Sequence, residues 1–444
     1  MSIMTIVEVL VAAGVLALLG RSARSTNWRD AGNGTYIGFG IAGLALLYII
    51  YAYFKAKYFP ANPAVPEGSF FRWAIQGFVI FAAGGWLFRE AGKAIGTEGS
   101  RKLFRSMPIT ASFGILTILI YAFVALFAGP IPLSMVVLVA LIGALLSQLA
   151  LTFSGIAAQQ TGHTVTIVLT GICLIMYYYG GLAPYGEAQI LPRANLLPGG
   201  NAATGGDPAH LLGTDQIGRD ILSRLIYGAR NTVGIAFITT CLAFLIGGTF
   251  GFLAATLGGW TDQVCSRIVD ALMAIPQLIF ALLLMTIATA WAGSNGALIT
   301  VYMVLIIAVL DSTRVYRLSR AVGLNIVVMD YIEAAKLRGE NLSYLIFREI
   351  LPNATAPLLA EFGLRFCFVF LTIAALSFLG IGIQPPRADW GTMVRDLGQF
   401  VNFAQFSPLT AALPLMCAGA IALLTVAVNF VVDWMLHRSS GLKE

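Results

Sequence analysis

The sequence predicts an all-α integral membrane protein with about eleven transmembrane helices. Apolar residues make up 58% of the 444 residues, charged residues make up only 11%, and the mean hydropathy is +0.84. An average soluble domain has about 25% charged residues, so water cannot solvate a surface of this composition over its whole area. The composition therefore excludes a soluble enzyme, a disordered chain and a nucleic-acid-binding module.

Eleven apolar stretches are expected to cross a hydrocarbon core of about 30 Å, which requires roughly 20 residues per helix. In chain order they are residues 3–20, 35–54, 73–88, 111–128, 135–153, 164–181, 232–257, 272–291, 297–315, 357–381 and 409–436. The first stretch has no basic leading region and carries Glu8. It is therefore interpreted as a retained helix rather than a signal peptide.

Basic residues predict the orientation of these spans. With the C-terminal end of the last span in the cytoplasm, most of the 27 Lys and Arg residues fall on the inner side, as the positive-inside rule requires. The hydrophilic stretches are then an inner loop at 89–110, an outer segment at 182–231 and an inner segment at 316–356. Helices need only short connections, so function is expected in the two long segments.

The inner segment is expected to form a helix, a glycine turn and a second helix at the membrane surface. Asp330 is the expected N-cap of the first helix, and Glu333 would complete a capping box. Gly339 is expected to end this helix in the left-handed region. Asn341 or Ser343 is expected to cap the second helix. Proline at position 352 is expected to end it.

The same segment contains a spaced motif. It reads Glu-Ala-Ala, three further residues, a glycine, and then Leu-Pro twelve residues after that glycine. This spacing resembles the cytoplasmic EAA loop of ABC importer permeases, and an amphipathic hairpin that merely covers the helix bundle is the alternative. In that family the loop forms a coupling helix that docks on an ATPase subunit. The resemblance assigns this role to Glu333, Ala334, Ala335, Gly339, Leu351 and Pro352.

The outer segment is expected to contain a helix that leads into the next span. Thr214 or Asp215 is the expected N-cap, and apolar residues recur every four positions from Ile217. Asp220 and Arg224 have the spacing of an ion pair on the opposite helix face.

Residues 212–230 also resemble the GTDxxGRDxxSRxxYGAR signature of the C-type (OppC/DppC-like) permease of oligopeptide and dipeptide importers. Residues 375–391 resemble the ALSFLGLGxQPPxxxWG segment of the same family. The resemblance covers about residues 165–440. It implies a six-helix, MetI-like permease core at 165–444, preceded by an accessory module of about five membrane helices at 1–164. The outer signature positions are Gly213, Thr214, Asp215, Gly218, Arg219 and Asp220.

The resemblance also implies a function and a set of partners. The chain would be a permease subunit of a binding-protein-dependent ABC importer in a bacterial or archaeal cytoplasmic (inner) membrane, with peptides as the expected cargo. It would assemble with a B-type sister permease, two ABC ATPase subunits and an extracytoplasmic substrate-binding protein. The sequence contains no G-x-x-x-x-G-K-[ST] run. ATP and Mg are therefore expected to be used by the partner ATPases, and this chain is expected to bind no cofactor or nucleic acid and to catalyse no reaction.

Two alternatives remain open at this point. Relatives of this class also carry nickel complexes and other small solutes, which leaves the cargo open. A secondary transporter is the alternative mechanism, although the internal repeats and paired midplane carboxylates typical of that class are not seen in the sequence. The five cysteines and three histidines are scattered, so the sequence predicts neither a disulfide framework nor a metal site.

Polar residues within the predicted spans are candidates for the translocation path, because such residues usually face a cavity or each other. The candidates are Pro276, Gln277, Glu361 and Arg365. Glu361 and Arg365 lie one helical turn apart, and the favoured alternative is that they simply form an ion pair with each other. Pro276 is expected to kink its span, either to open backbone to a pore or for packing alone. Asp311 is expected to act as an anchor near a span end.

Overall fold

The computed structural model describes residues 83–93, 98–130, 132–137, 139–142, 180–197, 209–403 and 408–439, with Asp207 and seven single positions between 166 and 178. All named elements in this part of the chain are helices, which confirms the all-α class. The predicted spans 3–20 and 35–54 and the domain boundary near residue 164 lie outside the described residues. Most of the spans 73–88 and 135–153 and half of the span 164–181 lie outside them as well.

Among the described residues, five helical segments are long and apolar enough to cross a membrane. They are α5 (Ile109–Phe127), Ile221–Leu257, α12 (Gly296–Val327), Leu342–Phe378 and Thr410–His437. The second joins α8 (Ile221–Gly228), the π-helical turn η2 (Ala229–Val233) and α9 (Gly234–Leu257). The fourth joins α14 (Leu342–Tyr344), the π-helical turn η3 (Leu345–Ile350) and α15 (Leu351–Phe378). The last lies within α17 (Pro408–Ser439).

A sixth candidate span is a bent pair of helices. The helices α10 (Gly259–Met273) and α11 (Gln277–Ala292) have the length and hydropathy of one span only when taken together, and they meet at 87°. Pro276 precedes α11 with φ −55° and ψ 123°, so the backbone leaves the helical region directly before Gln277. The predicted span at 272–291 is therefore too long at its start, and the predicted kink at Pro276 is a sharp elbow.

Two other predicted helix ends, at Pro352 and at residue 315, are wrong. Pro352 does not end a helix: it lies in the first turn of α15, and the helical path runs on from Leu342 to Phe378. A proline removes one backbone donor from a helix, and the π-helical turn η3 directly precedes it. The helix α12 likewise continues to Val327, twelve residues beyond the predicted end of its span.

The described residues fall into two compact units, each described by itself. The first holds the residues up to Leu119 and those from Ala422 onward. Within it, the α4 helix (Glu98–Ser106) is held by Arg89, whose Nε donates to the carbonyl of Phe104 at 3.3 Å. Gly114 of α5 lies against the backbone of Ala427, because a Cβ there would stand 2.4 Å from the Ala427 carbonyl oxygen.

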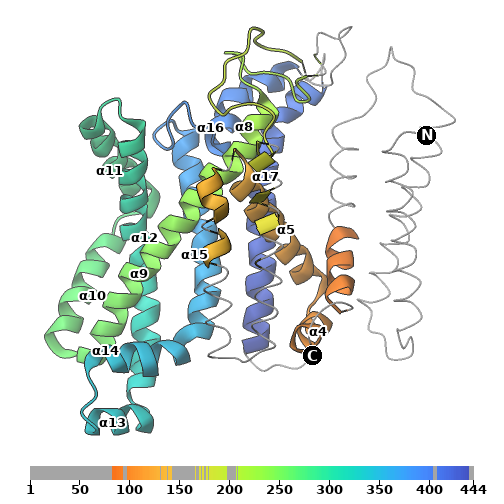
Figure 1. The fold of residues 1–444 in the computed structure, drawn as a ribbon. Coiled ribbons are helices and arrows are strands. Elements are labelled where there is room, and N and C mark those ends of the chain that lie inside the picture. Colours follow the sequence, from red (N-terminus) through yellow and green to blue (C-terminus); the bar gives the residue numbers. More distant parts are fainter. Residues whose placement is uncertain are drawn as a thin grey trace. The chain divides into compact units, whose positions relative to one another are not determined.

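The second unit holds the residues from Ile120 to Phe403 together with Leu409–Ile421. Its centre is the α9–α12 pair, whose backbones approach closely. A Cβ on Gly247 would lie 2.4 Å from the carbonyl oxygen of Ser312, and one on Gly251 would lie 2.8 Å from that of Tyr316. Figure 1 shows α13 (Asp330–Leu337) at one end of this unit, and α8 and α16 (Trp390–Leu397) at the other end.

Candidate functional site

The inner segment forms the predicted helix, glycine turn and second helix. Helix α13 ends at Leu337, and Gly339 follows with φ +79°, as expected for the left-handed residue that ends a helix. The side chain of Asn341 accepts a hydrogen bond from the backbone N–H of Tyr344 at 2.8 Å and caps the second helix. The turn and the second cap are confirmed.

The expected capping box at the start of α13 is wrong. Met329 occupies the N-cap position, and its side chain accepts no hydrogen bond. Asp330 and Glu333 both lie in the first helical turn. They still stabilise the helix there, because a carboxylate near a helix N-terminus interacts favourably with the helix dipole.

One side of α13 faces the rest of the chain. Ile332 and Ala335 are fully buried in an apolar cluster that also contains Ile350, and Leu351 packs against that cluster. Burying an isoleucine side chain such as that of Ile332 contributes about 1.5–3 kcal/mol relative to leaving it in water. Ala335 and Leu351 of the predicted coupling motif therefore hold the segment in place rather than line its surface.

The other side of α13 is exposed and partly apolar. Leu337 is 83% exposed, Val328 is 79% exposed and Phe347, in η3, is 65% exposed. Ala334 and Glu333 are exposed on α13 as well, and so is Pro352 at the start of α15. We call Val328, Ala334, Leu337 and Phe347 the inner apolar surface.

The outer signature folds as a tight turn before it becomes a helix. Gly213 and Gly218 have φ values of +77° and +87°. A Cβ on Gly213 would lie 2.1 Å from the carbonyl oxygen of Leu196, and one on Gly218 would lie 2.5 Å from that of Leu191. Both positions require glycine for two reasons. Their φ values are positive, and the backbone of residues 191–196 leaves no room for a Cβ atom.

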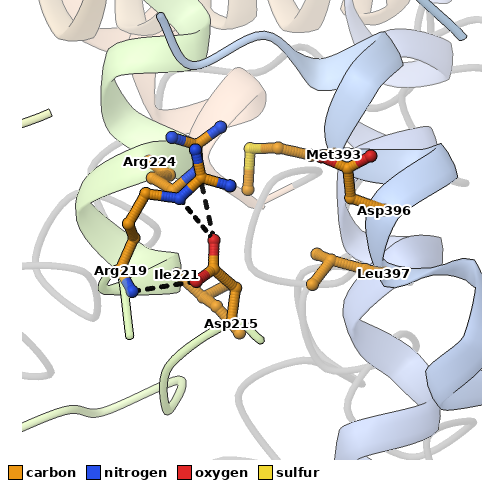
Figure 2. A pocket seen from close by; sticks show the side chains of 7 residues that line it. All are labelled: Asp215, Arg219, Ile221, Arg224, Met393, Asp396 and Leu397. Carbon is orange, nitrogen blue, oxygen red and sulfur yellow. Dashed lines mark hydrogen bonds and ion pairs between the residues drawn. The ribbon is translucent and has the colours of Figure 1, made fainter. Parts of the chain in front are cut away.

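Asp215 organises this turn. Its carboxylate accepts hydrogen bonds from the backbone N–H groups of Ile217 and Arg219 at 3.1 and 2.8 Å and pairs with Nε of Arg219 at 2.7 Å. Nε of Arg224 lies 4.0 Å from the same carboxylate. Figure 2 shows these three charged side chains beside Met393 and Asp396 of α16, where they line a small pocket.

The helix begins later than expected. Asp220, not Thr214 or Asp215, caps α8 by accepting from the backbone N–H of Ser223 at 2.8 Å. Its second oxygen pairs with Nδ1 of His210 at 3.0 Å, so the expected Asp220–Arg224 pair does not form. The hydroxyl of Thr214 instead donates to the carbonyl of Arg193 at 3.0 Å.

The two resembling segments come together at the outer end of this unit. The hydroxyl of Thr232 donates to the buried carboxylate of Asp389 at 2.8 Å, and the indole N–H of Trp390 donates to the carbonyl of Leu225 at 2.9 Å. Asp389 also caps α16 by accepting from Thr392. Burial raises the pKa of Asp389 above its ordinary value, against the lowering effect of the hydrogen bonds from Thr392 and Thr232.

The polar residues predicted within the spans form a cluster. Nε2 of Gln277 donates to Oδ2 of Asp311 at 2.8 Å. Nε of Arg365 lies 2.7 Å from Oε1 of Glu361, which confirms the predicted i, i+4 pair. Asp311 is 0% exposed in the middle of α12, so the expectation that it anchors a span end is wrong. Pro276 directly precedes Gln277 in the sequence, but its side chain is exposed and does not belong to this cluster.

Sequence reasoning missed two members of these networks. His210 is buried against Asp220, and Asp311 joins Gln277 to the α12 helix. The only signal for either residue was an ionisable group within or beside an apolar stretch. Within the part of the chain that the structure describes, no group of three or more His, Cys, Asp or Glu residues is arranged to hold a metal ion.

Comparisons with known proteins identify the family. Residues 247–440 match the model of the binding-protein-dependent transport system inner membrane component. The dipeptide transport system permease protein DppC of Escherichia coli K12 is 36% identical over 276 residues, which are 62% of this chain and 87% of that protein. DppC of Haemophilus influenzae is 35% identical over 242 residues, covering 54% of this chain and 78% of that protein.

A third relative broadens the group. The peptide transport system permease protein SapC of Escherichia coli O6:H1 is 33% identical over 263 residues, covering 59% of this chain and 84% of that protein. These matches cover most of each relative but leave more than a third of this chain unmatched. The several apolar helices of the structure are those expected of a multi-pass membrane permease, which is what the matched proteins are. The chain therefore belongs to the OppC/DppC-like permeases of binding-protein-dependent ABC importers, which are inner-membrane components.

Proposed function

We propose that this chain is the peptide permease subunit of an ABC importer and that α13 couples it to separate ATPase subunits. The relatives above are described as dipeptide and peptide permeases, which supports peptides over nickel complexes or other small solutes as cargo. The resemblance supports a B-type sister permease, two ATPases and an extracytoplasmic binding protein as partners. In this scheme ATP hydrolysis belongs to the partner chains.

The inner apolar surface is the observation that carries the coupling role. Leu337 and Phe347 are large apolar side chains at the inner end of the unit and are mostly exposed. Exposed apolar patches mark sites of contact with a protein or a membrane, and the resemblance to the EAA loop favours a protein here. Helix α13 is held in place beneath this surface, because Ile332 and Ala335 on its opposite side are fully buried. A partner that binds Leu337 can therefore move α13 without unfolding it.

The chain also provides a route for that movement. The second helix begins at Leu342, directly after the glycine turn and the Asn341 cap, and continues without a break to Phe378. At about 1.5 Å per residue, this helical path is roughly 55 Å long. We expect a displacement at the turn to be transmitted along this helical path, which has its π-helical turn at Leu345–Ile350 and a proline, Pro357, inside α15.

Replacing Leu337 with Glu tests the coupling role. Losing the burial of one leucine costs about 1.5–3 kcal/mol at a partner surface, and each 1.4 kcal/mol is tenfold in affinity. We expect at least tenfold weaker association with the ATPases, measured by copurification and by binding of the ATPases to the permease in nanodiscs. The matched control is Ile190→Glu, because Ile190 is 67% exposed in the outer segment. Normal ATPase binding by Leu337→Glu would refute the coupling role of α13.

We further propose that residues 1–164 form an accessory membrane module beside a self-sufficient core at 165–444. The support is that the family motifs begin only after residue 165 and that the relatives match 54–62% of this chain. Membrane helices of separate modules associate by van der Waals packing and interhelical hydrogen bonds, such as the one that the Tyr121 hydroxyl donates to the Ala420 carbonyl at 2.9 Å. A chain that starts near Gln160 is expected to insert, assemble and transport, with lower thermal stability than the full chain. A truncated chain that binds its ATPases but transports nothing would place the first 160 residues in the pathway or its gating.

A further inference from the structure

Arg365 lies between two carboxylates that belong to different helices. Its Nε is 2.7 Å from Oε1 of Glu361, which is one turn earlier on α15, and its Nη1 is 3.9 Å from Oδ1 of Asp311 on α12. Arg365 and Asp311 are both buried, and Glu361 is partly exposed. Arg365 therefore has one close carboxylate partner on its own helix and a second, more distant one on the neighbouring helix. Its guanidinium also lies over the ring of Phe368, 4.6 Å from the ring centroid.

The present arrangement leaves buried polar atoms without hydrogen-bond partners. These atoms are Nε and Nη1 of Arg365 and Oδ1 of Asp311. The contact with Glu361 is close enough for an ion pair, but its geometry is not that of a hydrogen bond. A buried donor or acceptor without a partner costs about 1–3 kcal/mol, and more for a charged group. A shift of the guanidinium toward Asp311 would satisfy Nη1 and Oδ1 together, so a second arrangement has its partners in place.

Asp311 is also tied to the broken span. Its other oxygen, Oδ2, accepts from Nε2 of Gln277 at 2.8 Å, and Gln277 is the first residue of α11 after the elbow at Pro276. When Arg365 engages Asp311, that one carboxylate links α11, α12 and α15. When Arg365 remains on Glu361, α15 is released from this link and only the α11–α12 contact persists.

Arg365 is placed to respond to movement at the inner end of the unit. It lies on the continuous helical path from Leu342 to Phe378, 23 residues after its start, which corresponds to roughly 35 Å at 1.5 Å per residue. A small shift or rotation of this helix changes the distances from Arg365 to Asp311 on α12. The distance to Glu361 changes less, because both residues belong to the same helix.

We propose that Arg365 is a positioning residue that exchanges Glu361 for Asp311 during the transport cycle and so locks and releases the α10–α11 elbow. The exchange supplies the two discrete states that a packed helix bundle needs to transmit movement. It rests on the proposed ABC permease mechanism, because the partner ATPases drive the helix movement. Removing either carboxylate biases the same equilibrium, and the two removals act in opposite directions.

The test uses the full chain assembled with its partner subunits in nanodiscs. Spin labels at Ala274, beside the elbow, and at Thr355, on α15, report the distance between these elements in a background without the native cysteines; both positions are exposed. Asp311→Asn retains an oxygen that accepts from Gln277 but removes the charge, and Glu361→Gln does the same for the other partner. We expect the ratio of the two distance populations to shift at least threefold, in opposite directions for the two variants.

The control is Asp207→Asn, which neutralises the carboxylate of a partly exposed pair with Arg193 at 4.0 Å, outside the elbow and its neighbouring helices, and is expected to leave the populations unchanged. If Asp311→Asn inserts poorly, Asp311→Glu replaces it. The longer side chain reaches toward Arg365, so its expected shift has the direction of Glu361→Gln. Shifts of the same sign, or no shift, in the two neutralised variants would overturn the exchange. A wild-type chain that binds no ATPase would instead contradict the proposed function, while the distances remain measurable.

Discussion

Replacing Gly339 with Val is expected to reduce cargo uptake at least tenfold while the chain still inserts into the membrane. Gly339 has φ +79°, and a left-handed conformation costs an ordinary residue about 1–2 kcal/mol and a β-branched one more. A Cβ at this position would meet no atom within 4 Å, so the effect is one of backbone conformation alone. The turn would relax into another geometry and shift α13 relative to the helix that begins at Leu342.

The matched control for this variant is Gly339→Asn, because asparagine tolerates the left-handed region much better than valine. Uptake should be highest with Gly at position 339, lower with Asn and lowest with Val, when measured with the assembled complex in proteoliposomes. Insertion is measured separately by the yield of monodisperse complex. Equal uptake by the Asn and Val variants would show that the conformation of this turn does not matter for transport.

Replacing Gly247 with Ala is expected to have the largest effect on stability. The new Cβ would stand 2.4 Å from the carbonyl oxygen of Ser312 and 2.9 Å from the backbone nitrogen of Tyr316. Backbone atoms cannot yield as a flexible side chain can, so α9 and α12 must separate. Overpacking of this kind typically costs 1–3 kcal/mol. We expect a clear drop in the melting temperature of the detergent-solubilised complex and a lower yield.

The adjacent residue provides the control for Gly247→Ala. In Gly248→Ala the new Cβ would have only the hydroxyl of Ser319 nearby, at 4.0 Å. Alanine stabilises a helix interior by about 0.5–1 kcal/mol relative to glycine. The melting temperature of Gly248→Ala should therefore stay the same or rise. A fall of similar size in both variants would mean that helix contacts at Gly247 are not the cause.

Local features of the inner segment could be predicted because they depend on neighbouring residues. The left-handed turn at Gly339 and the cap formed by Asn341 follow from conformational preference and short-range hydrogen bonding. The same reasoning failed at Asp330, where the chain begins α13 one residue earlier. It also failed at Pro352, because a π-helical turn precedes the proline and the helix continues through it.

Long-range pairings could not be predicted from residue types. Asp220 was expected to pair with Arg224 at helical spacing, yet it caps the helix and binds His210, because the helix begins five or six residues later than expected. The contact between Gln277 and Asp311 joins different helices. Hydropathy locates a span but does not say which side of it faces a neighbour, so the buried position of Asp311 depends on tertiary packing.

The bond between Thr232 and Asp389 has a consequence for biosynthesis. It joins residues 157 positions apart, and a ribosome delivers the earlier one long before the later one. Until Trp390 emerges, the Leu225 carbonyl lacks the indole N–H that binds it. The Thr232 hydroxyl likewise lacks its acceptor until Asp389 emerges. These contacts at α8 and η2 therefore form only after Asp389 and Trp390 have been synthesised. A chain that ends before these residues leaves this part of the structure open.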